Sequence, residues 1–290
     1  MTPLFGIFPV PEAAQRERVV EQVLLADRLG LDLVGIQDHP YQRRFLDTWT
    51  LLSYLAGRTE RIRLFPDVAS LPLRSPALLA KAAASLDLLS GGRVELGLGA
   101  GAFWEGIGAW GGPVRSPRES VDALAEAIAI IRRVWAAERG IRFDGAHYRM
   151  NGAHGGPEPA HAMGIWLGAY GPRMLRLVGS AADGWVPSLP RLPLAEVPAR
   201  QAAIDEAARA AGRDPAAIVR VANVNGAIVD GEATGWLHGP VEHWVDELTK
   251  LITELRFDGL VLWPDHDDPL GQTELFATEV VPRVRRAIVV

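Results

Sequence analysis

The chain has 290 residues, of which 48% are hydrophobic and 22% charged, and its formal net charge is −5. This length supports a large hydrophobic core, and the even spread of apolar residues favours one domain over residues 1–290. Because like charges are not clustered, we expect neither nucleic acid nor a membrane surface as a partner. The absence of cysteine excludes disulfides, thiolate catalysis and sulfur-ligated metal sites. Since no signal-like or membrane-spanning segment is evident, we expect a cytoplasmic protein.

Short β-rich segments alternate with amphipathic helical segments along the whole chain. The eight candidate strands are Leu4–Pro9, Asp32–His39, Ile62–Ala69, Arg93–Gly101, Gly164–Gly171, Asp183–Leu189, Val219–Val229 and Gly259–Pro264. Eight strand–helix repeats predict an α/β fold, a single (β/α)8 TIM barrel. An open doubly wound sheet is the alternative, but the segment after the first strand, Pro9–Glu12, lacks the glycine cluster of a dinucleotide-binding loop.

Helix starts between these strands carry clear capping signals. A helix is expected to begin at Ser75-Pro76, a second at Ser116, where Glu119 completes the spacing of a capping box, and a third at Gly239-Pro240. Two long connections, near residues 101–116 and 143–163, are rich in Gly, Pro, His and Trp. We expect both at the mouth of the barrel, where loops that follow strands build active sites.

Polar residues at the ends of the second and third strands are the first candidates for chemistry. Asp38 and His39 end the second strand, and a histidine at the barrel mouth can exchange a proton near neutral pH. Asp38 points to the opposite side of the strand, so we expect it to hold neighbouring backbone. In the third strand, Asp67 lies among apolar residues, which indicates either a bulge or a carboxylate paired with a nearby arginine such as Arg74.

The stretch Leu86–Trp104 is the most informative part of the chain. Two glycines end a helix, a short apolar strand follows, and Gly97, Gly99 and Gly101 then remove side chains in alternation. This pattern is typical either of a tight corner or of a backbone that lies close against a flat ligand. The stretch alone does not decide between them.

The end of the fifth strand offers a site for an anion. Tyr170 and Gly171 lead into Pro172-Arg173, which opens a helix and leaves backbone N–H groups beside a planar cation. Tyr41, Trp104 and Trp263 are expected near the mouth, where several aromatic side chains favour an apolar ligand pocket. The acidic segment 265–268 resembles solvated loop more than a metal cluster, so we predict no metal site and keep a metal hydrolase that uses Asp38, His39 and His266 as a minor alternative.

In this order, these segments resemble the bacterial luciferase-like monooxygenase family, whose members are (β/α)8 barrels that bind flavin mononucleotide (FMN) or the deazaflavin coenzyme F420. The segments that carry the resemblance are Ala26–His39, Val68–Pro76, Leu86–Gly101, Trp166–Pro172 and Ala182–Trp185. The resemblance covers nearly the whole chain. Its most specific element is the glycine-rich run that ends at Gly101.

The resemblance implies a role for each candidate residue. His39 would be the acid or base at the reactive face of the cofactor, and the peptide between Asp67 and Val68 would be the cis bond that supports the ring. Substrate would contact Tyr41, Trp104 and Trp263. The residues implied to bind cofactor are Asp38, Asp67, Val68, Gly99, Ala100, Gly101, Tyr170, Gly171, Pro172, Arg173 and Trp185.

One departure shapes the functional expectation. Some deazaflavin-dependent members carry a glutamate directly after the glycine turn, where this chain has Ala102. We therefore expect an oxidoreductase that transfers hydride to, or monooxygenates, a small, partly apolar organic substrate, with F420 favoured over FMN. A non-catalytic flavin-binding barrel is the alternative. The resemblance also implies a homodimer.

Overall fold

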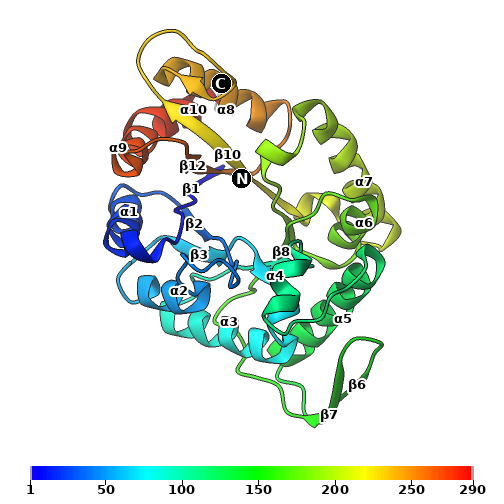
Figure 1. Cartoon of the computed structure of the whole chain (residues 1–290). Helices are drawn as coiled ribbons and strands as arrows, with labels where there is room; N and C mark the ends of the chain where they lie inside the picture. The colour runs from blue at the N-terminus through cyan, green and yellow to red at the C-terminus, as the bar shows by residue number, and fades with distance from the viewer. Residues whose placement is uncertain (1, 289–290) are drawn as a thin grey trace.

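The computed structural model describes residues 2–288 and shows a parallel barrel surrounded by helices (Figure 1). All neighbouring barrel strands pair in parallel, in the order β3-β2-β1-β12-β10-β9-β8-β5-β4. Their bounds are β1 Leu4–Ile7, β2 Leu33–Ile36, β3 Arg63–Pro66, β4 Ala69–Ser70, β5 Leu96–Gly99, β8 Ile165–Leu167, β9 Gly184–Trp185, β10 Val219–Ile228 and β12 Gly259–Pro264. The predicted barrel is confirmed, and each of the eight predicted segments contains at least one of these strands.

The third predicted strand is divided into β3 and β4, and this division closes the barrel. β3 pairs with β2, whereas β4 pairs with β5. A parallel bridge between Leu64 and Val94 joins the two sides below the division. The peptide bond between Asp67 and Val68, which lies between β3 and β4, is cis.

Helices form the outer ring of the barrel (Figure 1). The capping box at Ser116 and Glu119 is present at the start of α5, and α3 ends at Gly91, which adopts a left-handed φ of 73°. The helices are α1 Arg16–Arg28, α2 Thr48–Ala56, α3 Pro76–Ser90, α4 Trp104–Ala109, α5 Pro117–Trp135, α6 Pro172–Ala181, α7 Val197–Ala210, α8 Val241–Thr253, α9 Pro269–Leu275 and α10 Val281–Ala287, with a π-helical turn, Phe276–Val280, before α10. No helix within residues 2–288 is both long and apolar enough to cross a bilayer.

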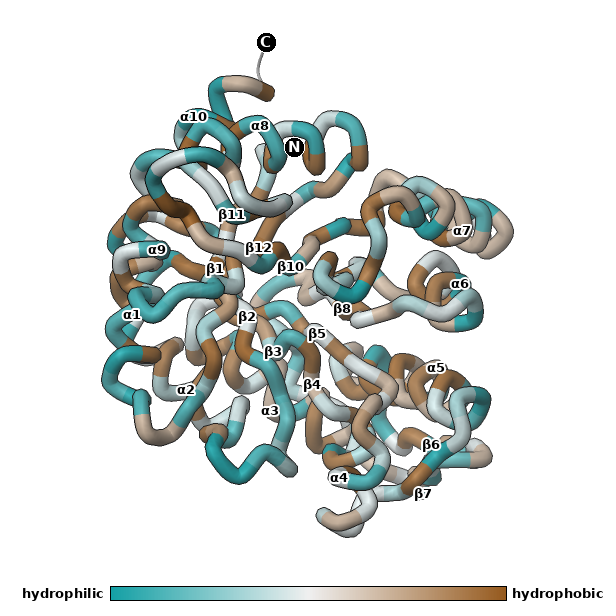
Figure 2. The backbone as a smooth tube through the Cα atoms, turned by 45° about the horizontal axis from the view of Figure 1, so that its top comes forward, coloured by the Kyte–Doolittle hydropathy of each residue, from teal (hydrophilic) through white to brown (hydrophobic). Residues whose placement is uncertain are grey.

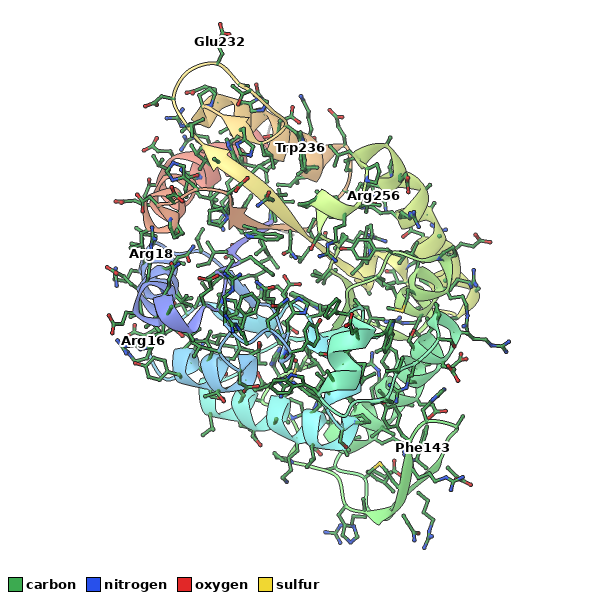
Figure 3. All side chains as sticks on the ribbon, in the orientation of Figure 1. Arg16, Arg18, Phe143, Glu232, Trp236 and Arg256 are labelled. Carbon is green, nitrogen blue, oxygen red and sulfur yellow. The ribbon has the colours of Figure 1, made fainter. Side chains whose placement is uncertain are left out.

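The two long connections lie at opposite ends of the barrel, which corrects the expectation for the second. Residues 101–116 follow strand β5 and contain the short helix α4. The segment near 143–163 follows helix α5 and leads into the start of β8, so it lies at the N-terminal end of the strands. It contains part of an antiparallel hairpin, β6 (Ile141–Asp144) and β7 (Arg149–Ala153), and Figure 3 labels Phe143 on this hairpin at the edge of the molecule.

Apolar side chains form two layers. The inner layer fills the barrel and includes Phe8, Phe65 and Trp166. The larger outer layer lies between the strands and the helices, and Figure 2 shows hydrophobic stretches along both. A further two-residue strand, β11 (His238–Gly239), pairs in parallel with the C-terminal end of β10.

Candidate functional site

A cavity of about 910 Å³ lies at the carboxyl ends of the barrel strands. Its lining comes from β4, from the segments that directly follow β1, β2, β3, β5, β8 and β9, from the end of β12, and from the first turns of α5 and α6. This is the face where barrel enzymes place their active sites. The predicted site residues that line the cavity are Asp38, His39, Tyr41, Asp67, Val68, Gly99, Ala100, Gly101, Trp104, Tyr170, Gly171, Pro172, Arg173 and Trp263.

His39 is held in the cavity wall with one ring nitrogen free. Its Nδ1 lies 2.7 Å from the hydroxyl oxygen of Tyr41. Its Nε2 is not buried and makes no hydrogen bond within residues 2–288. Burial lowers the pKa of His39, the charge of Asp38 opposes this shift and Arg191 adds to it. At neutral pH the ring is therefore mainly uncharged.

Asp38 is a structural anchor of the cavity wall. Its carboxylate accepts a bidentate pair of hydrogen bonds from Arg74, both 2.8 Å long, and a third of 2.9 Å from the backbone N–H of Ser70. The pair ties the end of β2 to the turn after β4. This confirms that Asp38 holds neighbouring backbone, and it shows that the alternative pairing of Arg74 with Asp67 was wrong.

Asp67 is buried at the floor of the cavity, and no cationic side chain within residues 2–288 forms an ion pair with it. Its side chain lies over Gly35, where an added Cβ would come within 2.9 Å of Oδ2. Oδ2 itself has no hydrogen-bond partner among the described residues. Burial raises the pKa of Asp67 to about 7, and the nearby side-chain amide of Asn223 opposes the shift.

Replacing Asp67 by asparagine is expected to change how the stability of the cofactor-free protein depends on pH. The pKa is about 7 in the folded protein against 3.8 for an unperturbed aspartate, so the folded state binds the proton more tightly. Asp67 therefore makes the wild type lose stability as pH rises from about 4 to about 7, and the asparagine variant lacks this contribution. Urea unfolding measures the free energy of unfolding of both proteins. The value for the variant minus the value for the wild type should rise by about 2 kcal/mol from pH 5 to pH 8.

The control for this measurement is Asp230→Asn, which changes an exposed aspartate. Its difference from the wild type should be the same at both pH values. If Asp67→Asn also gave a constant difference, Asp67 would not be a proton-binding group in the folded protein.

Glycine backbone forms part of the cavity wall, as the glycine-rich stretch predicted. A Cβ on Gly99 would lie 2.8 Å from Cγ2 of Val68, and one on Gly168 would lie 3.2 Å from the same atom. Gly101 has a φ of +100°, and its added Cβ would meet Pro72 and Trp104. Val68 therefore projects between two glycine-bearing strand ends, and bulk at these positions would displace it.

The start of α6 forms the opposite side of the cavity. Gly171 is the N-cap, no side chain caps the helix, and a Cβ on Gly171 would meet no atom within 4 Å. Arg173 lines the cavity, but Nη2 donates a 2.6 Å hydrogen bond to Asp122 of α5, so its charge is partly balanced. Tyr170 accepts a 2.8 Å hydrogen bond from the backbone N–H of Ser188.

Trp185 differs from its predicted role. It is fully buried in the outer apolar layer, its Nε1 donates to the carbonyl of Ala169, and its ring stacks on Phe257 at 6.0 Å. It does not line the cavity. Successive residues of a strand point to opposite faces, so its neighbour Val186 faces the interior instead.

Several lining residues were not predicted. Phe8, Gly168 and Ser188 follow β1, β8 and β9, so reading every strand end would have found them. Phe8 packs against Trp263 with 5.3 Å between ring centroids. Arg191 also lines the cavity, from a short 3-10 turn, Leu189–Arg191, that comes after β9. Within residues 2–288, no group of three or more His, Asp or Glu side chains could hold a metal ion.

The sequence of the chain is similar to those of a known enzyme family. The family described as luciferase-like monooxygenase matches residues 4–237. The F420-dependent glucose-6-phosphate dehydrogenase of Intrasporangium calvum is 34% identical over 176 residues, which are 58% of this chain and 52% of that protein. The phthiodiolone/phenolphthiodiolone dimycocerosates ketoreductase of Mycobacterium kansasii is 34% identical over 243 residues, or 82% of this chain and 63% of that protein. The chain thus spans about half to two thirds of these relatives.

A solved structure extends the similarity of fold to almost the whole chain. An F420-dependent secondary alcohol dehydrogenase, in complex with an F420-acetone adduct, superposes with a TM-score of 0.87 and 18% sequence identity. The match covers 98% of this chain and 99% of that one. Together, the matched family segment, the barrel and the cavity at its carboxyl end show that the chain belongs to the luciferase-like monooxygenase family.

Proposed function

We propose that the protein is an oxidoreductase that uses a flavin-type cofactor, F420 in preference to FMN, on a small, partly apolar organic substrate. The observation that carries the proposal is His39, an imidazole with a free Nε2 in a large cavity that is also lined by glycine backbone and aromatic side chains. The names of the relatives favour F420 over FMN. The reaction is hydride transfer or oxygen activation.

The residues of the cavity fit such a cofactor. A planar ring needs closely approaching backbone, which Gly99 and Gly168 provide on either side of Val68. A phosphate needs N–H donors, and the uncapped start of α6 at Gly171 offers them in open space. The cavity volume of about 910 Å³ is at the upper end of the usual range for ligand sites.

When bound, the cofactor supplies the hydride or the electrons for oxygen reduction. The chain's own residues do the rest. Val68 and the glycine backbone orient the ring, and Phe8, Trp104 and Trp263 exclude water from the reacting atoms. His39 donates a hydrogen bond or exchanges a proton from Nε2. Asp38 and Arg74 keep the wall that carries His39 in place.

Cofactor preference is tested by titrating the purified, cofactor-free protein with F420 and, separately, with FMN. We expect F420 to bind at least about 10-fold more tightly, measured as quenching of cofactor fluorescence. Tighter binding of FMN would overturn the preference. Stopped-flow reoxidation of the reduced, bound cofactor then tests catalysis, because a non-catalytic flavin-binding barrel would show no substrate-dependent rate.

Two further properties complete the proposal. The first is a cytoplasmic location, as expected from the sequence. We also propose a homodimer, on the basis of the family resemblance. Light scattering of the purified protein would measure its mass against the 31.4 kDa of one chain.

A further inference from the structure

The hydroxyl of Tyr41 makes a short hydrogen bond to His39 that the proposed chemistry has not yet used. The oxygen lies 2.7 Å from Nδ1. Tyr41 is held in this position by the segment after the glycine turn: its ring packs against Phe103 with centroids 5.3 Å apart. Gly106 of α4 leaves room for it, because a Cβ there would lie 2.8 Å from Cγ of Tyr41. The pair is therefore fixed from two directions.

The surroundings decide which atom of the pair carries the proton. Burial raises the pKa of Tyr41, and the charge of Asp38 raises it further while Arg191 opposes the shift. The phenol thus keeps its proton, and the lowered pKa of His39 keeps the ring neutral. Between a neutral phenol and a neutral imidazole, the stronger arrangement has the O–H donating to the ring nitrogen, because the phenol is the stronger acid. Asp38 and Arg191 are the charged side chains that shift the pKa values of both His39 and Tyr41.

We propose that Tyr41 is a positioning residue, which donates its proton to Nδ1 of His39 and so fixes the tautomer in which Nε2–H points to the ligand. This inference rests on the proposed function and deepens it. His39 then meets the ligand as a hydrogen-bond donor. The ligand atom opposite Nε2 must be an acceptor that gains negative charge, which describes a carbonyl oxygen.

The class of substrate follows from this donor. When a carbonyl carbon receives a hydride with its electron pair from the reduced cofactor, the π pair of the C=O bond moves to the oxygen. Nε2–H stabilises that developing charge, as a neutral imidazole can. The oxygen then takes a proton from water, leaving an alcohol, a hydroxide ion in the solvent and the oxidised cofactor. The site is thus arranged for reduction of a ketone or aldehyde.

The tautomer can be measured in the cofactor-free protein by nitrogen NMR of 15N-histidine-labelled samples. Loss of one set of resonances in His39→Gln assigns the ring. In the wild type we expect a protonated Nε2 and an unprotonated, hydrogen-bonded Nδ1. In Tyr41→Phe the Nδ1 resonance should move to the position of a ring nitrogen without a donor. A wild-type spectrum with a protonated Nδ1, or no change in Tyr41→Phe, would overturn the inference.

The rate of carbonyl reduction by Tyr41→Phe tests the role of Tyr41 independently of the NMR measurement. Tyr41→Phe should lower the rate of carbonyl reduction about 10-fold or more while the Kd for the cofactor stays unchanged. Tyr54→Phe is the matched control, because Tyr54 is an exposed residue of α2 whose hydroxyl accepts a hydrogen bond from Arg58. An equal rate in Tyr41→Phe and the wild type contradicts the inference. If the wild type transfers no hydride at all, the proposed function fails, while the NMR result still decides the tautomer.

Discussion

Replacing His39 by alanine is expected to lower the rate of substrate-dependent reoxidation of the bound cofactor by about 100-fold or more. General acid–base and hydrogen-bond catalysis by a positioned histidine contributes this much in enzymes. The cavity walls that hold the ring, from Val68 to Gly171, remain in the variant, so the Kd for the cofactor should change little. Stopped-flow spectroscopy measures the rate, and fluorescence titration measures the Kd on the same sample.

The control for this variant is His154→Ala, which removes an exposed histidine beside the hairpin at the other end of the barrel. Its rate should equal that of the wild type. Unchanged turnover in His39→Ala, with cofactor still bound, would remove the proposed role of His39. A large loss of cofactor affinity would instead make His39 chiefly a binding residue.

Replacing Arg74 by alanine is expected to destabilise the folded protein by about 3 kcal/mol. The Asp38 side chain is 1% exposed, and the bidentate bond from Arg74 is its only ion pair within the described residues. Removing the guanidinium leaves a buried carboxylate with only the N–H of Ser70 as a donor. Urea denaturation at neutral pH measures the loss. The pKa of Arg74 is raised by its hydrogen bonds to Asp38, which outweigh burial, so the guanidinium is charged throughout.

Two further variants separate this effect from others. Asp47→Asn removes the second carboxylate that Arg74 contacts, but asparagine still caps α2, so we expect a loss below about 1 kcal/mol. The double variant Asp38→Asn/Arg74→Ala should be more stable than Arg74→Ala alone, because no buried charge is left without a partner. Equal stability of the double and single variants would show that the loss comes from the packing of Arg74.

Sequence patterns predicted half of the residues that line the cavity, because a barrel gathers the ends of its strands. His39 and Gly99 follow β2 and β5, so their place at the mouth depends only on the count and direction of strands. Trp185 was misplaced because β9 is only two residues long, too short for alternation to show which face each side chain takes. The segment near 143–163 was misplaced because its composition resembles that of a mouth loop, although it follows a helix.

The sequence by itself determined the barrel, the glycine-rich wall and the histidine at its mouth, since periodicity and turn residues are local properties of the chain. Only the tertiary structure decided which charges meet. Arg74 is seven residues from Asp67 but binds Asp38, 36 residues away, because the pairing of β2 with β3 and the turn after β4 place Asp38 beside Arg74. The same packing leaves Asp67 buried without a cation and sets Tyr41 against His39. Protonation depends on burial and on neighbours across strands, and these exist only in the folded chain.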